Sequence, residues 1–129
     1  MKFKFIVLIV VLVLSTFTAI QAQSKMEVNS KQVNQMLQKD SKLIVLDVRS
    51  ADEFKEGHIK GAINIDILAP DAYAKIDKLD HNAKYIVHCR TYHRSTTAFD
   101  YMKQSGFKKV YQMMDGMKGW SQNKLSVVK

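Results

Sequence analysis

The feature that most constrains the fold is the alternation of short apolar runs with segments of helical periodicity. Residues 43–46 and 85–87 are uninterrupted apolar runs, and residues 110–113 form a further run with one polar member. Continuous runs of this length are typical of strands buried on both faces, as in parallel sheets. Because helical segments separate the runs, the sequence predicts a three-layer α/β/α fold around a central, mostly parallel sheet.

Capping residues and periodicity place the other elements. A first helix is expected from Ser30, capped by Ser30 or Asn29, with an apolar face that includes Val33. Ser50 and Glu53 have the spacing of a capping box, which opens a short helix that should stop near residue 57. The remaining expected elements are a strand over 59–67, a helix from about Pro70, a strand over 85–88, a helix over 95–104 and a final helix over 116–122.

Residues 1–22 have the pattern of a secretory signal peptide. Two lysines within residues 1–4 precede an unbroken apolar segment over 5–14, and cleavage is expected after Ala22. If the segment is not cleaved, its apolar stretch, which extends to Ile20, would act as a signal anchor. The domain is therefore expected to be exported, to the periplasm or outside the cell, and to contact a membrane only if this segment is retained.

The rest of the chain is expected to form one domain. We expect a flexible leader over 23–29, a single compact domain over 30–125 and a C-terminal tail over 126–129. Hydrophobic residues make up 47% of the sequence and charged residues 25%, which is typical of a folded globular protein. The formal net charge is +8, but the basic residues are scattered, so nucleic acid is not an expected partner and small anions are favoured ligands.

The single cysteine, Cys89, directly follows the expected strand 85–88 and opens a polar loop. Ligands bind beyond the carboxyl ends of parallel strands, where backbone N–H groups of the loop and of the next helix stabilise a thiolate or an oxyanion. A buried structural cysteine is the alternative interpretation, but a polar, twice-basic loop is poor packing material. We therefore interpret Cys89 as a nucleophile assisted by Arg94. The candidate anion-binding residues are Arg90, Thr91, Tyr92, His93 and Ser95.

Four blocks of sequence together resemble the rhodanese-like family, from about Ser24 to Trp120. They are Leu46-Asp47-Val48-Arg49 with Glu53, Gly57-His58-Ile59-Lys60-Gly61-Ala62-Ile63-Asn64, the Cys89 loop, and Asp115-Gly116-Met117-Lys118-Gly119-Trp120. The resemblance implies a rhodanese-like fold and a sulfurtransferase. In it, Cys89 would take sulfane sulfur from a small anionic donor such as thiosulfate, hold it as a persulfide and pass it to a thiol or cyanide acceptor.

The resemblance also assigns roles to individual residues. Arg94 would orient the loop and offset anionic charge, and Ser95 would cap the following helix. Asp47 and Arg49 would shape the rim of the site as a hydrogen-bonded carboxylate and guanidinium. His58 would have a structural role. No cofactor is implied, and no pair of the four histidines has metal-ligand spacing with a nearby carboxylate or thiol, so no metal site is expected.

Two positions depart from the family pattern. Tyr92 stands where the family usually has Gly, and a tyrosine resists the positive φ that a tight loop can require. Asp115 stands where the first Gly of a pair is usual, and this change is expected to affect only a turn.

Two rival functions remain open at this point. Related folds use a Cys and Arg loop to hydrolyse phosphates or reduce arsenate, but Cys89 and Arg94 enclose four residues, and the phosphatase relatives enclose five. The second rival is a non-catalytic sulfur carrier or binding module, which Tyr92 motivates.

Overall fold

The computed structural model describes residues 26–129, and these residues form a five-stranded parallel sheet covered by helices. The strands lie in the order β1-β5-β4-β2-β3, and every pairing between them is parallel. The strands are β1 (Glu27–Val28), β2 (Ile44–Asp47), β3 (Ile63–Asn64), β4 (Lys84–His88) and β5 (Lys109–Met113). The helices are α2 (Ser30–Lys39), α3 (Ala51–Glu56), α4 (Ala72–Asp77), α5 (His93–Gln104) and α6 (Gly116–Gln122). The predicted fold class is confirmed.

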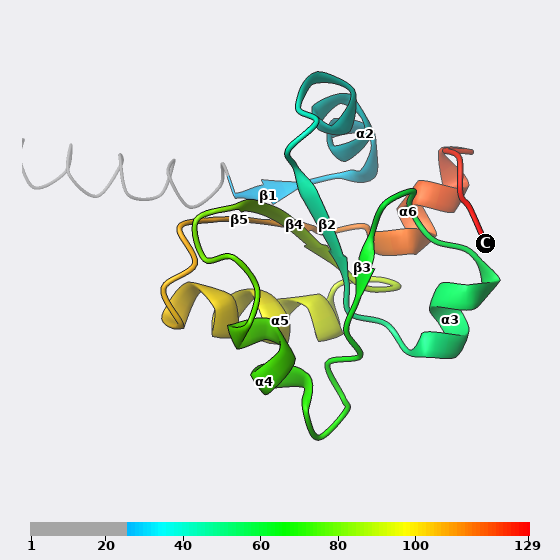
Figure 1. Ribbon diagram of the computed structural model, residues 1–129. Coiled ribbons are helices and arrows are strands. Elements are labelled where there is room, and N and C mark those ends of the chain that lie inside the picture. The colour runs from blue at the N-terminus through cyan, green and yellow to red at the C-terminus, as the bar shows by residue number, and fades with distance from the viewer. Residues whose placement is uncertain (1–25) are drawn as a thin grey trace, which may run out of the picture.

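Each face of the sheet carries its own apolar core, because successive side chains of a strand point to opposite faces. Val87 of β4 packs on one face with residues of α4 and α5, among them Ala98 and Met102. Ile86, its neighbour, packs on the other face with residues of α2 and α6, including Trp120. Figure 1 shows the resulting layers, with α4 and α5 on one side of the sheet and α2 on the other.

The helix starts largely follow the predicted capping residues. Asn29, one of the two expected caps, accepts a hydrogen bond from Gln32 N of 2.9 Å and begins α2. Ser50 and Glu53 form the expected capping box of α3, and Gly57 ends that helix. The helix expected from about Pro70 begins two residues later, at Ala72, directly after Asp71.

The expected strand over 59–67 is mostly wrong. Only Ile63 and Asn64 pair regularly with β2. The chain then stays beside β2 through single hydrogen bonds, from Ile65 N to Asp47 O and from Ile67 N to Val48 O, which do not extend the ladder. β3 lies at the edge of the sheet, so this segment has a strand on one side alone.

Both ends of the described chain are more ordered than expected. Glu27 and Val28, assigned to a flexible leader, form β1, because Gln112 N and Met114 N donate hydrogen bonds to the backbone there. At the other end, Val128 and His58 exchange two backbone hydrogen bonds of 2.9 Å, so the expected tail is tied to the domain.

The predicted signal peptide over residues 1–22 lies outside the described residues. Within residues 26–129, no helix has both the length and the apolar character needed to cross a membrane.

Candidate active site

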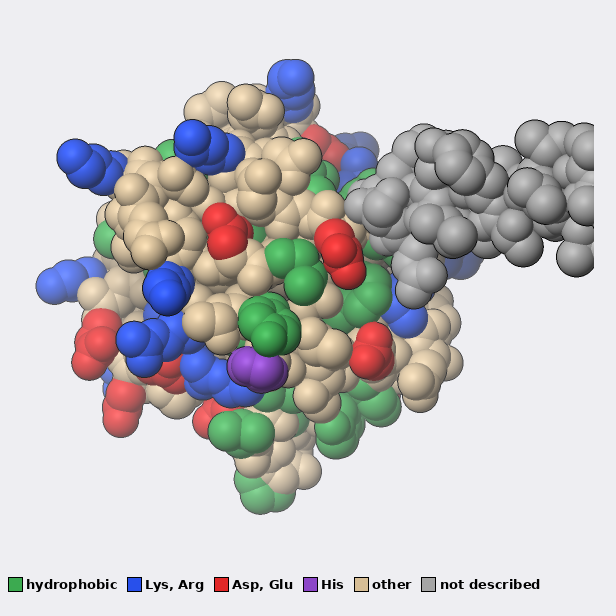
Figure 2. Space-filling view, turned by 180° about the vertical axis from the view of Figure 1, so that it is seen from behind, with side chains coloured by type: hydrophobic (Ala, Val, Ile, Leu, Met, Phe, Trp, Pro, Cys, Tyr) green, Lys and Arg blue, Asp and Glu red, His purple; other side chains and the backbone are tan. Residues whose placement is uncertain are grey.

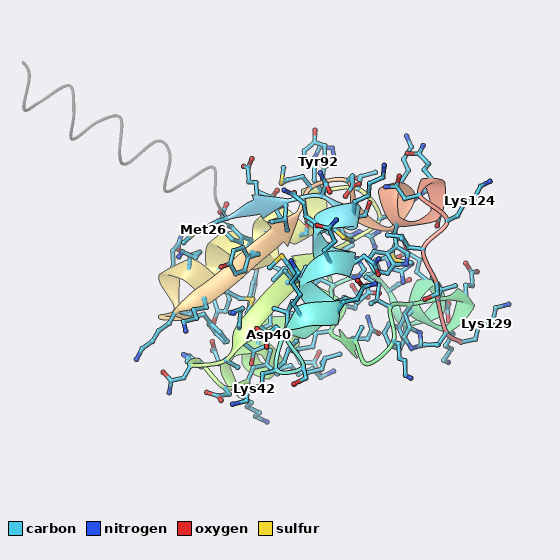
Figure 3. The ribbon with its side chains drawn as sticks, turned by 90° about the horizontal axis from the view of Figure 1, so that it is seen from above. Met26, Asp40, Lys42, Tyr92, Lys124 and Lys129 are labelled. Atoms are coloured by element: carbon cyan, nitrogen blue, oxygen red, sulfur yellow. The ribbon has the colours of Figure 1, made fainter. Side chains whose placement is uncertain are left out.

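The loop after β4 lies at the carboxyl edge of the sheet, as predicted. Asp47 and His88, the last residues of β2 and β4, are partners in register, and Cys89 follows immediately. Figure 3 shows Tyr92 of this loop at the opposite side of the molecule from Lys42, which precedes β2. The structure therefore brings the ends of two central strands together with the cysteine loop.

Cys89 is 1% exposed and belongs to the core cluster that includes Val48, Ile65 and Ala98. This burial is what the alternative interpretation, a structural cysteine, would show. The sequence analysis had expected a less buried thiol because the loop after Cys89 is polar. The residues that follow it differ in character, because Arg90, Tyr92 and His93 are exposed. The thiol therefore lies beneath a polar loop instead of at the protein surface.

The N–H groups of residues 90–95 donate no hydrogen bond within the described part of the chain. The carbonyl groups, in contrast, are used. Cys89 O accepts from Met117 N at 2.9 Å, and Arg90 O accepts from Lys118 N at 3.0 Å. The first turn of α6 thus holds two carbonyl oxygens of the loop. The N–H groups of the loop remain free to bind an anion, as in other backbone anion sites.

Tyr92 O is the most heavily used acceptor in the loop. It accepts hydrogen bonds from Thr96 N, Thr96 Oγ1, Ser95 Oγ and Gln112 Nε2 at 2.8 to 3.2 Å. Gln112 also bonds to both hydroxyl oxygens, and it is 4% exposed. This polar residue within the predicted strand 110–113 was a signal of a loop-supporting role that the sequence analysis did not use.

One prediction about the loop is wrong, and the conflict considered for Tyr92 does not arise. Ser95 does not cap α5, because the helix begins at His93 and Ser95 lies within its first turn, buried, with its hydroxyl donating to Tyr92 O. Tyr92 does not require a positive φ. Its φ is −148°, and Lys124 is the one non-glycine residue with positive φ within residues 26–129. A tyrosine therefore fits this backbone, and its half-exposed ring lies 4.1 Å, centroid to centroid, from that of His93.

Gly116 is required for the contact between α6 and the loop. Its φ is +55°, and a Cβ at this position would overlap the carbonyl oxygens of Arg90 and Thr91. Asp115 does more than alter a turn, in contrast to the sequence expectation. Its carboxylate accepts hydrogen bonds from Ser30 N at 2.8 Å and Ser30 Oγ at 2.7 Å, which fixes the start of α2 beside α6.

Arg94 forms a bidentate ion pair with Glu53 of α3. Its Nη1 and Nη2 donate to the two carboxylate oxygens at 2.7 and 2.9 Å. Hydrogen bonding to Arg94 lowers the pKa of Glu53 to about 2, against the opposing effect of burial. The same contact raises the pKa of Arg94, to which the proximity of Cys89 also contributes.

The predicted role of Arg94 is therefore shared with Glu53, which the sequence analysis placed in a capping box and in one of the family-like blocks but not in the site. Glu53 caps α3 and neutralises the loop arginine. The signal that could have found it is an acidic side chain at the first turn of a helix that begins at the carboxyl edge of the sheet.

Asp47 and Arg49 form the expected hydrogen-bonded pair at the end of β2, but the pair is buried, so the Asp47 carboxylate does not reach the surface. Asp47 is fully buried and Arg49 is 6% exposed. Arg49 Nη2 lies 2.7 Å from Asp47 Oδ2 and also donates to Gly57 O at 2.8 Å. The pair is linked to the loop through His88, whose Nδ1 lies 3.1 Å from Cys89 O.

His88 is a buried histidine with one unsatisfied nitrogen. Its Nε2 lies 3.6 Å from Asp47 Oδ2 and has no hydrogen-bond partner within the described chain. Burial lowers the pKa of His88, although Asp47 acts in the opposite direction. The buried environment therefore disfavours the charged form of His88.

The other histidines contribute less to the site. His58 stacks on Phe54 with ring centroids 3.7 Å apart, and its Nδ1 lies 2.9 Å from Phe54 O, so its contacts are structural. Across residues 26–129, no group of three or more His, Cys, Asp or Glu side chains is placed to hold a metal ion. On the face drawn in Figure 2, Lys and Arg side chains lie beside a histidine and hydrophobic side chains, with Asp and Glu side chains next to them.

Comparisons with known proteins agree with this geometry. YrkF of Bacillus subtilis, named as a sulfur carrier protein, is 31% identical over 100 residues, which cover 78% of this chain and 53% of that protein. This chain thus spans about half the length of that relative. YtwF of the same organism, named as a sulfurtransferase, is 31% identical over 94 residues, covering 73% of this chain and 88% of the relative. The thiosulfate sulfurtransferase GlpE of Coxiella burnetii is 27% identical over 84 residues, covering 65% and 77%.

Solved structures share the fold. A rhodanese-related protein from Thermoplasma volcanium has a TM-score of 0.71 and 27% identity, covering 79% of this chain and 96% of that chain. The BH2092 protein from Bacillus halodurans has a TM-score of 0.73 and 23% identity, covering 88% and 84%. The family model for the rhodanese-like domain matches residues 29–123. With most of its length matched by that model, this chain belongs to the rhodanese-like domain family.

Proposed function

We propose that this protein is a sulfurtransferase that carries sulfane sulfur as a persulfide on Cys89. The observation that carries the proposal is the loop itself: a cysteine at the end of β4, followed by six N–H groups that have no acceptor within the described chain. The names of the relatives YtwF and GlpE support sulfur transfer as the general role. Thiosulfate as donor, and a thiol or cyanide as acceptor, are our finer proposal.

In the first step, the Cys89 thiolate attacks the outer sulfur of thiosulfate. The sulfur–sulfur bond of the donor breaks and sulfite leaves with the bonding pair, so that Cys89 holds a persulfide and no external oxidant is needed. The free loop N–H groups would stabilise the negative outer sulfur. In the second step, an acceptor attacks that sulfur and releases the Cys89 thiolate.

Arg94 would support this chemistry as a positioning residue. It lies in the first turn of α5, and its ion pair with Glu53 fixes the end of the loop against α3. Because Glu53 offsets the arginine charge, most of the stabilisation of a bound anion would come from backbone N–H groups.

Export of the domain remains part of the proposal, and it rests on the pattern of residues 1–22 alone.

Mass spectrometry after incubation with thiosulfate tests the proposal. We expect the intact protein to gain the mass of one sulfur atom, and Cys89→Ala to gain nothing. Cys89→Ser is the closer control, because it keeps a small polar side chain in the buried position. A chain that gains no sulfur from thiosulfate or from a polysulfide donor would refute the proposal.

A non-catalytic sulfur carrier is the second candidate, and the name of the relative YrkF, a sulfur carrier protein, favours it. Steady-state assays with cyanide separate the two functions. Repeated turnover supports an enzyme, whereas one sulfur atom released per chain supports a carrier.

A further inference from the structure

His88 is the residue directly before Cys89, and its side chain is fully buried at the end of β4. Its Nδ1 lies 3.1 Å from Cys89 O. Its Nε2 is the one buried side-chain nitrogen or oxygen within residues 26–129 that has no hydrogen-bond partner. Burying a polar atom without a partner costs free energy, so this atom beside the reactive loop requires a physical explanation.

We propose that His88 is a positioning residue of the sulfur-transfer site. Its Nδ1–H donates to Cys89 O and thereby fixes the direction of the Arg90 N–H, the first N–H group of the loop. The inference rests on the proposed function, because it concerns how the loop holds the negative outer sulfur. It assigns a role at the site to a side chain on the opposite face of the sheet.

The surroundings of the His88 ring decide which nitrogen carries the proton. A carbonyl oxygen only accepts hydrogen bonds, so the contact of 3.1 Å with Cys89 O requires a proton on Nδ1. In the neutral ring, Nε2 then holds a lone pair and faces Asp47 Oδ2 at 3.6 Å, which is too far for a hydrogen bond. The other tautomer would direct a lone pair at the carbonyl at the shorter of these two distances. The unsatisfied Nε2 is therefore a consequence of the hydrogen bond at Nδ1.

Asp47 does not compete for the ring proton, because Arg49 already occupies its carboxylate. Arg49 N, Nε and Nη2 all donate to the two carboxylate oxygens, at 2.7 to 3.1 Å. Burial lowers the pKa of His88, which disfavours a second proton on the ring. The proton at Nδ1 is thus left to bond with the backbone of the loop.

The side chains of β4 alternate between the two faces of the sheet, which separates the His88 ring from the thiol. Val87 and Cys89 belong to the core beside α4 and α5, whereas Ile86 belongs to the core beside α2 and α6. His88 therefore points to the α6 face. Cys89 O is held on the same face, because Met117 N of α6 also donates to it, at 2.9 Å. The ring can act on the thiol only through the backbone.

The peptide bond between Cys89 and Arg90 converts this contact into the orientation of an N–H group. The bond is trans and planar, so its N–H points opposite to its C=O. With Cys89 O held on the α6 face by two donors, the Arg90 N–H is directed to the face on which the thiol lies. That N–H has no acceptor within residues 26–129, so it is available to the negative sulfur.

The expected effect of losing the His88 donor is moderate. Removing one N–H donor from an oxyanion site slows a reaction by about 100-fold or more. Replacing His88 leaves the Arg90 N–H in place, and Met117 N still holds Cys89 O. The N–H would therefore be less well aligned but not lost, and we expect the rate of persulfide formation to fall by about tenfold.

Two amide substitutions test the assignment. The side-chain N–H₂ of Asn is as many bonds from the backbone as Nδ1 of His, whereas that of Gln matches Nε2. His88→Asn should therefore keep at least about half of the wild-type rate of persulfide formation from thiosulfate, and His88→Gln should be about tenfold slower. The rates are measured by rapid quenching and intact mass, after urea unfolding has shown that each variant is folded.

A role in packing alone would give the reverse order. Asn leaves a larger cavity than Gln in place of a buried histidine, so packing predicts that H88Q retains more activity than H88N. The ring nitrogens supply a second readout that uses wild type. Their ¹⁵N NMR shifts at neutral pH should show that Nδ1 of His88 is protonated and that Nε2 is not.

The outcomes separate this inference from the function on which it rests. If wild type forms no persulfide, the proposed function fails and the positioning role fails with it. If wild type forms the persulfide but H88N is as slow as H88Q or slower, the positioning role alone is refuted. A His88 ring protonated only at Nε2 would also refute it, because Cys89 O would then have no donor from the side chain.

Discussion

Replacing Glu53 with Gln should destabilise the protein through the loss of one ion pair. Glutamine is also accepted at this position of a capping box, so the start of α3 is retained. The pKa of Glu53 falls from an ordinary 4.5 to about 2, chiefly through Arg94, and this difference corresponds to about 3 kcal/mol. Because the carboxylate is 30% exposed and screened by water, we expect a loss of about 1–2 kcal/mol at pH 7.

The pH dependence of this loss has a defined sign. The pKa of Glu53 is lower in the folded than in the unfolded chain, so its contribution is complete above pH 4.5 and disappears as the pH falls toward about 2. Urea unfolding of wild type and E53Q should therefore differ most at neutral pH, and the two free energies should converge below pH 4.5.

Glu56→Gln is the matched control for this experiment. It removes the same charge from the same helix, at a residue that forms no ion pair within the described chain, and it should change the unfolding free energy by less than about 0.5 kcal/mol. A double-mutant cycle of E53Q with Arg94→Gln should give a coupling of about 1 kcal/mol. Equal stabilities of E53Q and E56Q, or a coupling near zero, would refute the reasoning.

Three further predictions concern the loop and its supports. Arg94→Ala should slow persulfide formation from thiosulfate about tenfold and more than Arg90→Ala does, because only Arg94 links the loop to α3; equal losses in stopped-flow assays would contradict this. Gly116→Ala should lower the unfolding free energy by about 2–4 kcal/mol, because its methyl group would overlap the loop carbonyls. Gly106→Ala, at φ +88° with no atom within 4 Å, should lower it by only about 1 kcal/mol. Similar urea midpoints for the two variants would argue against the contact between Gly116 and the loop. Burial lowers the pKa of His88, so below pH 6.5 the unfolded chain binds a proton that the folded chain does not, and the unfolding free energy should fall. The fall between pH 7 and pH 5.5, measured by urea unfolding, should be smaller in His88→Gln than in wild type. An equal fall in the two proteins would exclude this role.

The elements that carry strong local signals were predictable from the sequence. The apolar runs 43–46 and 85–87, and the capping box at Ser50, identified β2, β4 and α3 within one or two residues. The expected strand over 59–67 was mostly wrong, because its pairing depends on a single neighbour at the sheet edge. Glu27 and Val28 were missed because a two-residue strand has no periodicity, and it forms only by adding to β5.

By itself, the sequence determined that Cys89 would lie at the carboxyl edge of a parallel sheet, before a loop and a helix. That position follows from the order of local elements along the chain. Only the tertiary structure decided that the thiol is buried, that α6 holds the loop carbonyls, and that Glu53 neutralises Arg94. Glu53 and Arg94 are 41 residues apart, and Ser30 and Asp115 are 85 apart. Periodicity and capping record contacts within a few residues, whereas such pairs form only when distant elements pack together.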